Sequence, residues 1–129
     1  MKTSTSPEIA TPEQTLDTLR LKLREFASER DWEQFHTPKN LAMALSVEAS
    51  EIVEHFQWLT AEKSQELDKE TREKVSEEIG DVINYVVRLA DILGIDPLDA
   101  AIQKIESNAR KYPVDRSKGN ARKYTEIHG

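Results

Sequence analysis

Hydrophobic side chains recur every three or four residues along most of the chain, which is the spacing of one face of an α-helix. The first stripe follows a Thr-Pro-Glu-Gln run that begins at Thr11, with a hydroxyl and a proline placed as at a helix start. We therefore predict a helix from about Pro12 to about Glu29. Its apolar face consists of Leu16, Leu19, Leu23 and Phe26.

Two later threonines mark further helix starts. Thr37 precedes Pro38 and a new apolar stripe, so a second helix is expected from about Pro38 to about Trp58. Thr60 opens a polar segment with few apolar positions, which indicates a short exposed helix or a hinge. A connection of this kind allows the next long helix to return alongside the second.

The third long stripe is the widest and covers more than half of the circumference of its helix. We expect this helix to end at Gly94, and a last helix to run from Asp96-Pro97 to near Lys111. So wide an apolar surface needs neighbours on nearly every side, which favours a partner subunit over a helix central to a compact monomer. The stripe consists of Val75, Ile79, Val82, Ile83, Val86, Leu89, Ala90 and Leu93.

Composition supports an all-α protein with a four-helix-type bundle. The 129 residues contain 33% charged and only 6% aromatic side chains, with four glycines and five prolines, a mixture rich in helix formers. A chain of this length buries one modest core, so a single domain is expected. We predict a disordered segment at 1–10, a helical domain at 11–112, and a basic C-terminal tail at 113–129 that belongs to the same domain.

Charge and cysteine content exclude several classes of function. A net charge of -6 argues against a general nucleic-acid binder, although basic residues outnumber acids between Lys104 and Lys123. The absence of cysteine excludes disulfides, thiolate metal ligands and cysteine nucleophiles. The N-terminal residues lack the apolar core of a secretory signal, and no apolar run approaches the roughly 20 residues that cross a bilayer. We therefore expect a cytoplasmic protein with no membrane partner.

Two pairs of carboxylates border the apolar stripes of the second and third long helices. Glu48 and Glu51 lie near one stripe, and Glu78 and Asp81 lie at the edge of the other, each pair with a spacing of three. If the two helices pack antiparallel, the four acids face one another, where like charges repel and raise one another's pKa. A hard divalent cation removes that penalty, and Mg²⁺ prefers carboxylate oxygens together with water and phosphate.

We therefore predict that Glu48, Glu51, Glu78 and Asp81 hold Mg²⁺, for which Mn²⁺ could substitute. An isolated Glu-x-x-Glu pair is a weak signal, because such pairs usually form solvated helix faces. Two pairs beside two apolar stripes are a stronger signal. A carboxylate-bridged di-iron bundle is disfavoured, because it normally needs Glu-x-x-His pairs and the third long helix has no histidine.

The same residues resemble those of a known family. The runs Glu48-Ala-Ser-Glu51 and Glu78-Ile-Gly-Asp81 resemble the metal motif of the all-α nucleoside triphosphate pyrophosphatases. The segments around Trp32 and Trp58, together with the Lys-Tyr-Pro-Val and Arg-Lys-Tyr-Thr-Glu runs near the C-terminus, resemble the MazG-like, dCTP-pyrophosphatase-type branch. The resemblance covers roughly residues 15 to 127. It implies hydrolysis of a nucleoside triphosphate to the monophosphate and pyrophosphate by a homodimer or homotetramer, with a preference for deoxynucleotides, particularly of cytosine type.

The resemblance and the residue types together suggest how a nucleoside triphosphate would bind. Mg²⁺ on the four carboxylates would bind triphosphate oxygens while water attacks the α-phosphorus, and Glu51 could orient that water. Donors for the remaining phosphate oxygens are expected toward the end of the last helix and in the tail. They are Lys104, Asn108, Lys111, Tyr112, Arg122, Lys123 and Tyr124.

Aromatic residues near both ends of the second helix are candidates for the base site. Trp32 and Trp58 could sandwich a base, and His36 or Asn40 could read its edge. An isolated tryptophan is more often part of a core, but the resemblance favours base contact for both. Tyr85 would approach the sugar and disfavour a ribose 2′-hydroxyl.

Two other functions stay open at this point. A non-enzymatic helical interaction module would use the acids as solvated faces and the wide apolar stripe as an interface. A related hydrolase would act on a damaged or modified nucleotide and would differ in its choice of base. Activity on a panel of canonical and modified nucleotides would separate the three.

Overall fold

The computed structural model describes residues 14–123 together with 125 and 126, and the predicted disordered segment at 1–10 lies outside them. The described residues form helices and loops without a β-strand, which confirms the all-α prediction. The chain forms two compact units, 1–94 and 95–129. The elements are α1 (Leu16–Glu29), the 3-10 helix η2 (Glu33–Phe35), α2 (Pro38–Phe56), α3 (Ala61–Ser64), α4 (Lys69–Leu93), α5 (Pro97–Lys111) and α6 (Val114–Ser117).

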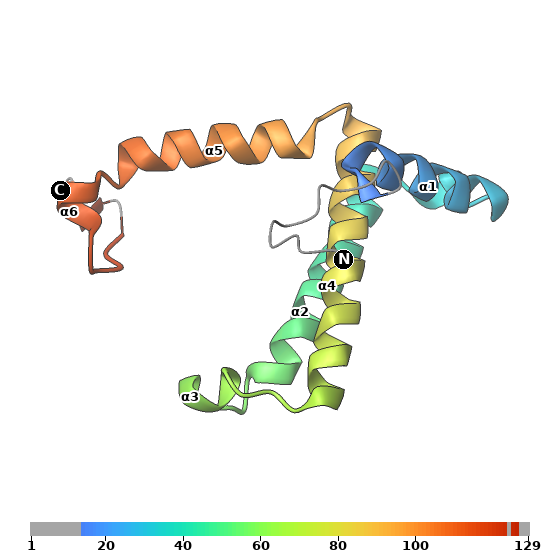
Figure 1. Cartoon of the computed structure of the whole chain (residues 1–129). Coiled ribbons are helices and arrows are strands. Elements are labelled where there is room, and N and C mark those ends of the chain that lie inside the picture. Colours follow the sequence, from blue (N-terminus) through green and yellow to red (C-terminus); the bar gives the residue numbers. More distant parts are fainter. Residues whose placement is uncertain (1–13, 124, 127–129) are drawn as a thin grey trace, which may run out of the picture. The chain divides into compact units, whose positions relative to one another are not determined.

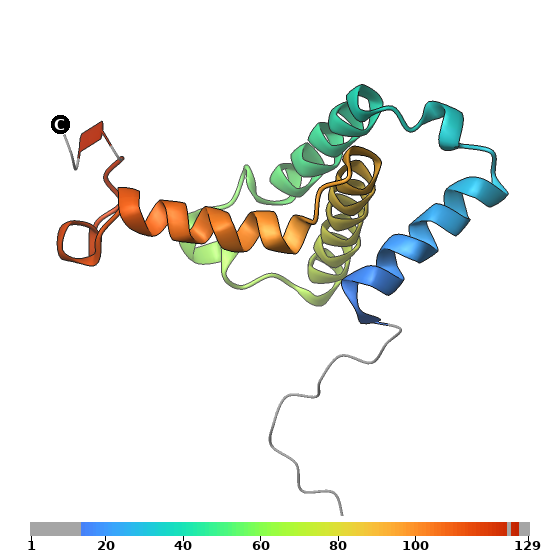
Figure 2. The same cartoon turned by 90° about the horizontal axis from the view of Figure 1, so that it is seen from above.

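The first unit is built around the antiparallel pair α2 and α4, which lie side by side in Figures 1 and 2. Leu41, early in α2, lines the same pocket as Arg88, late in α4. His55, at the other end of α2, contacts Glu78, which comes earlier in α4. Helix α1 packs against α4 as well. The antiparallel arrangement expected for the two carboxylate-bearing helices is therefore present.

The N-terminus of α1 differs from the prediction. The helix begins at Leu16, because the Thr15 hydroxyl accepts a 3.2 Å hydrogen bond from the Thr18 backbone N–H, and the Thr15 N–H donates to the Thr18 hydroxyl at 3.1 Å. This reciprocal capping box satisfies backbone donors at the helix start. The predicted start at Pro12 lies outside the described residues, and within them the α-helix begins only at Leu16.

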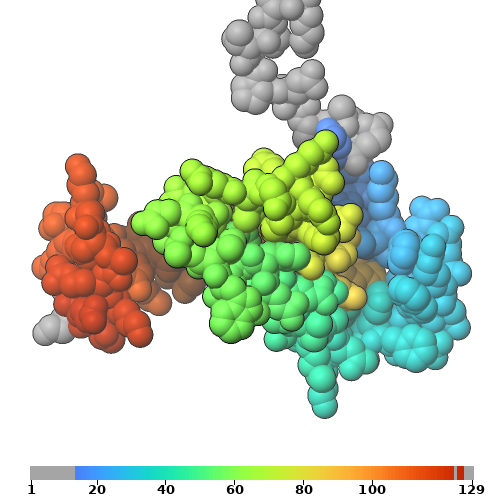
Figure 3. All heavy atoms as spheres, turned by 90° about the horizontal axis from the view of Figure 1, so that it is seen from below, coloured from blue at the N-terminus to red at the C-terminus, as the bar shows by residue number. Residues whose placement is uncertain are grey.

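The start of α2 agrees with the prediction, because the Thr37 hydroxyl accepts a 3.1 Å hydrogen bond from the Asn40 N–H. This helix ends at Phe56, two residues before the predicted end at Trp58. The short helix after Thr60 is α3, as expected. Seen from below in Figure 3, the atoms of α2, α3 and the first part of α4 form one continuous surface.

Helix α4 ends as its sequence predicts, with Gly94 in the left-handed conformation at φ 69°. At its other end the helix is capped by Asp68, whose carboxylate accepts a 2.7 Å hydrogen bond from the Thr71 N–H. That cap was not predicted, although aspartate is a favoured N-cap residue. The resulting helix of 25 residues is long enough to reach both ends of α2.

The hydrophobic core of the chain is small. Its buried apolar members are Ala27, Leu41, Val75, Val87 and Ala90. Much of the wide apolar stripe of α4 is uncovered, since Ile79 is 45% exposed and Ile83 is 47% exposed. Exposed apolar area of this kind is typical of a surface that another chain covers.

The second unit consists of α5 and the following residues. Asp96 caps α5 by accepting hydrogen bonds from the N–H groups of Leu98 and Asp99, and Pro97 occupies the first helical position, as predicted. The short helix α6 was not predicted within the tail. Within the described part of the chain, no helix has the length and apolar character needed to cross a membrane.

Candidate functional site

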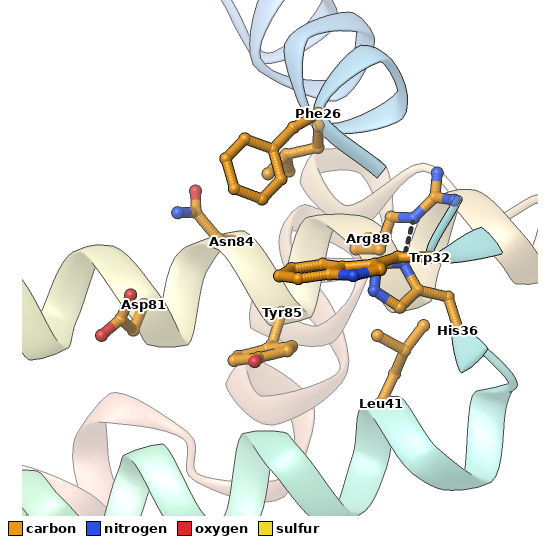
Figure 4. Close-up of a pocket in the computed structure, with 9 residues that line it drawn as sticks. Phe26, Trp32, His36, Leu41, Asp81, Asn84, Tyr85 and Arg88 are labelled. Atoms are coloured by element: carbon orange, nitrogen blue, oxygen red, sulfur yellow. Dashed lines mark hydrogen bonds between the residues drawn. The ribbon is translucent and has the colours of Figure 1, made fainter. Parts of the chain in front are cut away.

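A cavity of about 190 Å³ lies in the first unit, where α1 and η2 meet α2 and α4 (Figure 4). It is smaller than the roughly 300–1,000 Å³ of complete ligand pockets, so it suits part of a ligand, such as a single ring system. Its wall combines aromatic rings with a few polar groups. The lining residues are Leu23, Phe26, Trp32, His36, Leu41, Asp81, Asn84, Tyr85 and Arg88.

The turn after α1 places Trp32 in the pocket wall. Asp31 adopts the left-handed conformation at φ 54°, which aspartate tolerates better than most residues, and so reverses the chain. The Trp32 backbone N–H then donates to the Ala27 carbonyl at 2.9 Å. The indole meets Phe26 edge-on, with ring centroids 5.7 Å apart, and meets His36 at 6.5 Å. These contacts form an aromatic wall suited to a flat ring.

A network of polar side chains contacts His36 through Nδ1 of its ring. The Arg88 Nε–H donates to His36 Nδ1 at 3.1 Å, and Arg88 itself is buried. The Asp91 carboxylate receives a paired hydrogen bond from Arg24, at 2.6 and 2.7 Å, and a longer one of 3.5 Å from Arg88. Burial lowers the pKa of His36 below its ordinary 6.5, and the positive charge of Arg88 lowers it further. The ring is therefore neutral at pH 7.

The predicted carboxylates come together between α2 and α4. Burial raises the pKa of Glu48 above its ordinary value, and the carboxylates of Glu51, Asp81 and Glu78 raise it further. One oxygen of Glu48, Oε2, is buried and has no hydrogen-bond partner. Desolvated anions this close together are destabilising unless a cation or hydrogen-bond donors compensate for them.

Glu78 also has a buried oxygen without a hydrogen-bond donor. The same oxygen, Oε2, lies 2.6 Å from Nε2 of His55. This short contact does not have the alignment of a hydrogen bond. It is a close polar contact, and the oxygen still lacks a well-aligned hydrogen-bond donor. The carboxylate cluster therefore ends beside an imidazole at the C-terminal end of α2.

The chemistry of the cluster fits a hard divalent cation. It offers oxygen donors only, and two of those oxygens are buried without hydrogen-bond partners. Among the described residues, however, no three acidic or histidine side chains stand close enough to one another to hold a metal ion as they are. The carboxylates would have to turn toward one another for a cation to bind all four.

The structure brings some of the predicted base-site residues together and leaves others apart. Trp32, His36 and Tyr85 all line the aromatic pocket. Asn40 does not line it, and its amide instead donates to the Phe35 carbonyl at 3.0 Å, which ties η2 to α2. Trp58 is 88% exposed and follows the far end of α2, so it does not face Trp32 across the pocket of one chain.

The predicted phosphate donors belong to the second unit. Lys104, Asn108 and Lys111 follow one another on one face of α5, because they are separated by four and three residues. Tyr112 caps the end of that helix. The backbone N–H of Arg122 donates to the Asn120 side chain at 3.1 Å. Lys123 uses its backbone N–H to donate to Glu126 at 2.9 Å, and Tyr124 lies outside the described residues.

Sequence reasoning missed several residues of the pocket. Asn84 lies one helical turn beyond Asp81 and on the same edge of α4, so its spacing could have indicated it. Arg88 interrupts the apolar stripe of α4, and an arginine at a core position is an unusual signal that needs a partner. Phe26 was assigned only to the apolar face of α1, yet its ring lines the pocket and lies under the Arg30 guanidinium at 3.6 Å.

Comparison with known proteins gives concordant results. A family model described as the MazG-like family matches residues 43–127. The chain is 42% identical over 130 residues to dCTP pyrophosphatase 1 of Bos taurus, covering 98% of this chain and 77% of that protein. It is 43% identical over 121 residues to dCTP pyrophosphatase 1 of Homo sapiens, covering 92% and 71%.

A solved structure is similar to most of this chain. It is the crystal structure of a pyrophosphatase from Archaeoglobus fulgidus, which superimposes with a TM-score of 0.74 at 39% sequence identity. The match covers 82% of this chain and 99% of that chain. The similarity therefore includes both the sequence and the helical fold.

Proposed function

The chain belongs to the MazG-like family, and we propose that this nucleoside triphosphate pyrophosphatase converts deoxynucleoside triphosphates, preferentially that of cytosine, into the monophosphate and pyrophosphate. The observation that carries this proposal is the position of Asp81. It lines the aromatic pocket and also acts electrostatically on Glu48 in the carboxylate cluster. A ligand with a flat ring at one end and a metal-binding polyanion at the other matches both parts of this site.

The aromatic pocket binds the base in this proposal. Trp32 and Phe26 provide an aromatic wall, and the volume of about 190 Å³ favours a small ring system. His36 and Asn84 offer polar groups for the edge of the ring. Tyr85, one turn beyond Asp81, lines the same pocket and in this proposal would lie between the base and the phosphates, where its ring would exclude a ribose 2′-hydroxyl.

The carboxylate cluster would hold Mg²⁺ through Glu48, Glu51, Glu78 and Asp81, with Mn²⁺ as a substitute. Such an ion supplies Lewis-acid stabilisation of the negative charge that develops on the phosphate oxygens. The buried Glu48 oxygen without a hydrogen-bond partner and the incompletely satisfied Glu78 oxygen support this assignment. Burial and the neighbouring carboxylates raise the pKa of Glu48, and a cation held there would offset both effects.

The reaction needs water to attack the α-phosphorus and pyrophosphate to leave. We assign the orientation of that water to Glu51, whose carboxylate can accept a hydrogen bond from it. Donors from α5 and the residues after it would bind the outer phosphates through charge-assisted hydrogen bonds. This role falls to Lys104, Asn108, Lys111, Tyr112, Arg122, Lys123 and Tyr124.

The enzyme is a homo-oligomer in this proposal, either a dimer or a tetramer. Support comes from apolar side chains that a single chain leaves uncovered, among them Met43 and Val47 of α2 and Ile79 and Ile83 of α4. Trp58 follows the far end of α2, so a contact with the base would require the pocket of a second chain. Multi-angle light scattering on the purified protein tests the assembly directly.

The test of function is a product analysis with oxygen labelling. The purified protein is incubated with each dNTP and NTP and with Mg²⁺ in ¹⁸O-labelled water. We expect dNMP and unlabelled pyrophosphate, with the label in the monophosphate, because attack occurs at the α-phosphorus. Release of a diphosphate and inorganic phosphate, or no turnover of any substrate by folded protein, would overturn the proposal.

A second candidate substrate class uses the same site. A damaged or modified pyrimidine nucleotide would also fit an aromatic pocket of this size, so modified dNTPs belong in the substrate panel. A higher kcat/KM for one of them than for dCTP would assign the enzyme to removal of abnormal nucleotides. The earlier alternative of a non-enzymatic interaction module loses its support, because the relatives named above are enzymes.

A further inference from the structure

A chain of polar side chains leads from the aromatic pocket to the surface of the first unit. His36 lines the pocket, Arg88 lies behind it, Asp91 follows one turn later in α4, and Arg24 of α1 closes the chain. Arg88 is only 6% exposed, and the Asp91 side chain is 9% exposed, whereas that of Arg24 is 52% exposed. The network therefore holds a buried guanidinium against one side of an imidazole.

The direction of the hydrogen bond between Arg88 and His36 fixes where the imidazole carries its proton. Arginine has no acceptor, and its Nε carries a hydrogen in proteins. Because this Nε–H donates to Nδ1 at 3.1 Å, Nδ1 must keep its lone pair. The neutral ring then has its single hydrogen on Nε2, and that atom is a donor.

We propose that Arg88 is a positioning residue that locks His36 as an Nε2–H donor, so that the pocket selects a ring whose edge presents an acceptor there. The second part of this proposal rests on the proposed function, because it assumes that the pocket binds a base. Cytosine meets the requirement with its O2 and N3 atoms. In Figure 4 the second nitrogen of His36 lies on the side of the ring away from the dashed Arg88 contact, toward Tyr85.

The amide of Asn84 is adaptable and cannot provide this selection. Asn84 lines the cavity, and no described residue hydrogen-bonds to its amide. An amide can turn to present either its carbonyl or its NH₂ group. Asn84 can therefore match the remaining donor or acceptor of several bases, and we assign discrimination to the imidazole, whose donor is fixed.

The outer part of the network keeps Arg88 in place. A buried guanidinium is costly without a counter-charge, and Asp91 supplies one at 3.5 Å. Arg24 holds both oxygens of Asp91 and so fixes the orientation of that carboxylate. Arg24 does not line the pocket, so changing it tests the network without removing a pocket group.

Nitrogen-15 NMR of the histidine rings tests the lock directly, without substrate or metal. The spectrum distinguishes a protonated from an unprotonated ring nitrogen, and a His36→Gln variant assigns the signals among the three histidines. We expect His36 in the wild-type protein to be protonated at Nε2 and unprotonated at Nδ1 at pH 7.5. A ring protonated at Nδ1, or an even mixture of the two tautomers, would overturn the proposal without reference to any variant.

Two matched variants then test the role of Arg88. Arg88→Met keeps an unbranched chain as far as the position of Nε and removes the donor, and we expect a tautomer mixture at His36. Arg24→Gln should keep the Nε2–H tautomer, because it leaves both Arg88 and its counter-charge Asp91 in the protein. A pure Nε2–H tautomer in Arg88→Met would show that another group fixes the ring, and would contradict the assignment.

Kinetics test the selectivity. In Arg88→Met we expect kcat/KM for the preferred dNTP to fall about 10-fold, mainly through KM, because one hydrogen bond to the base is weakened. The ratio of kcat/KM for the preferred dNTP to that for the other dNTPs should fall as well. If a variant with a mixed tautomer keeps the base preference of the wild type, the proposed role of His36 in base selection is overturned. If the wild-type protein hydrolyses no dNTP, the proposed function fails, while the NMR result still decides the lock.

Discussion

Nε2 of His55 lies 2.6 Å from Oε2 of Glu78, so the C-terminal end of α2 touches the carboxylate cluster through an imidazole. Both side chains are mostly buried, with exposures of 22% and 19%. The contact engages one of the two carboxylate oxygens of the cluster that are buried without a hydrogen-bond partner. A cation that binds this oxygen must compete with the imidazole for it.

His55→Leu is therefore expected to tighten Mg²⁺ binding. Removing the imidazole leaves the Glu78 oxygen available to the ion, and the gain should be about 3- to 5-fold in Kd, the size expected for a partly exposed pair. Isothermal titration calorimetry with Mg²⁺ measures the change. His55→Gln keeps a polar hydrogen-bond donor and should bind Mg²⁺ like the wild type; equal affinities in all three proteins would contradict the competition.

Glu48→Gln should lower kcat/KM at least about 100-fold, because it removes a charged oxygen from the proposed metal site. The same change should raise the free energy of unfolding of the metal-free protein at neutral pH. The wild-type carboxylate is partly buried near three other acids, whereas the amide carries no charge. Activity assays and urea denaturation in EDTA measure the two effects.

The matched control for this change is Glu54→Gln, an exposed glutamate on the same helix. It should change kcat/KM by less than about 2-fold, since exposed polar changes are usually small. Loss of activity in Glu48→Gln with a parallel loss of stability would point to a structural role and against metal binding.

Tyr85→Ala should weaken discrimination against ribonucleotides. In the proposed function the ring lies where the sugar joins the phosphates, so its removal makes room for a 2′-hydroxyl. We expect the ratio of kcat/KM for dCTP to that for CTP to fall about 10-fold, a typical size for one steric contact. Tyr85→Phe keeps the ring and should keep the ratio. If Tyr85→Phe lowers the ratio as much as Tyr85→Ala does, the tyrosine hydroxyl discriminates through a hydrogen bond, and steric exclusion by the ring is contradicted.

Features that depend on neighbouring residues were predictable from the sequence, and long-range polar pairs were not. The Thr37 cap and the Gly94 end are encoded within one turn of the helix that they bound. The Thr15 cap at the start of α1 was missed, because it depends on Thr18 and the prediction relied on a proline after the capping hydroxyl. Periodicity placed the four acids between two helices, since the helix repeat fixes which residues share an edge.

The pocket network had no comparable local signal. His36 and Arg88 are 52 residues apart in sequence, and Arg24 and Asp91 are 67 apart. Hydropathy treats both arginines as surface residues, so only the packing of α1 against α4 reveals their partners. Trp58 was expected near Trp32 because both flank α2, but a helix of 19 residues spans about 28 Å and separates them.

Asp91→Asn should lower the free energy of unfolding by about 1–2 kcal/mol at pH 7, because it removes a charge-assisted pair with Arg24 that is shielded on the Asp91 side. The hydrogen bond from Arg24 lowers the pKa of Asp91 below its ordinary 3.8. Asp91 therefore makes its full contribution to the free energy of unfolding above pH 3.8. That contribution is lost as the pH falls through the lowered pKa of Asp91 in the folded state.

Urea denaturation of the wild type and of Asp91→Asn, measured from pH 7 downward, tests the direction of this pH dependence. The difference between the two proteins should be constant near neutrality and should shrink below pH 3.8. Asp17→Asn serves as the control, because Asp17 pairs with Arg20 at 2.8 Å but is 76% exposed, and it should cost less than about 0.5 kcal/mol. A difference that grows on acidification would contradict the assignment.

Gly94→Ala should destabilise the protein by about 1 kcal/mol or slightly more, because a side chain at φ 69° is strained in the left-handed region. No atom lies within 4 Å of the added methyl group, so the cost is conformational and not steric. Gly80→Ala is the matched control inside α4, where the added Cβ also meets nothing within 4 Å. There alanine should stabilise the helix by about 0.5–1 kcal/mol. Opposite signs in urea denaturation of the two metal-free variants would support the left-handed end of α4, and equal signs would contradict it.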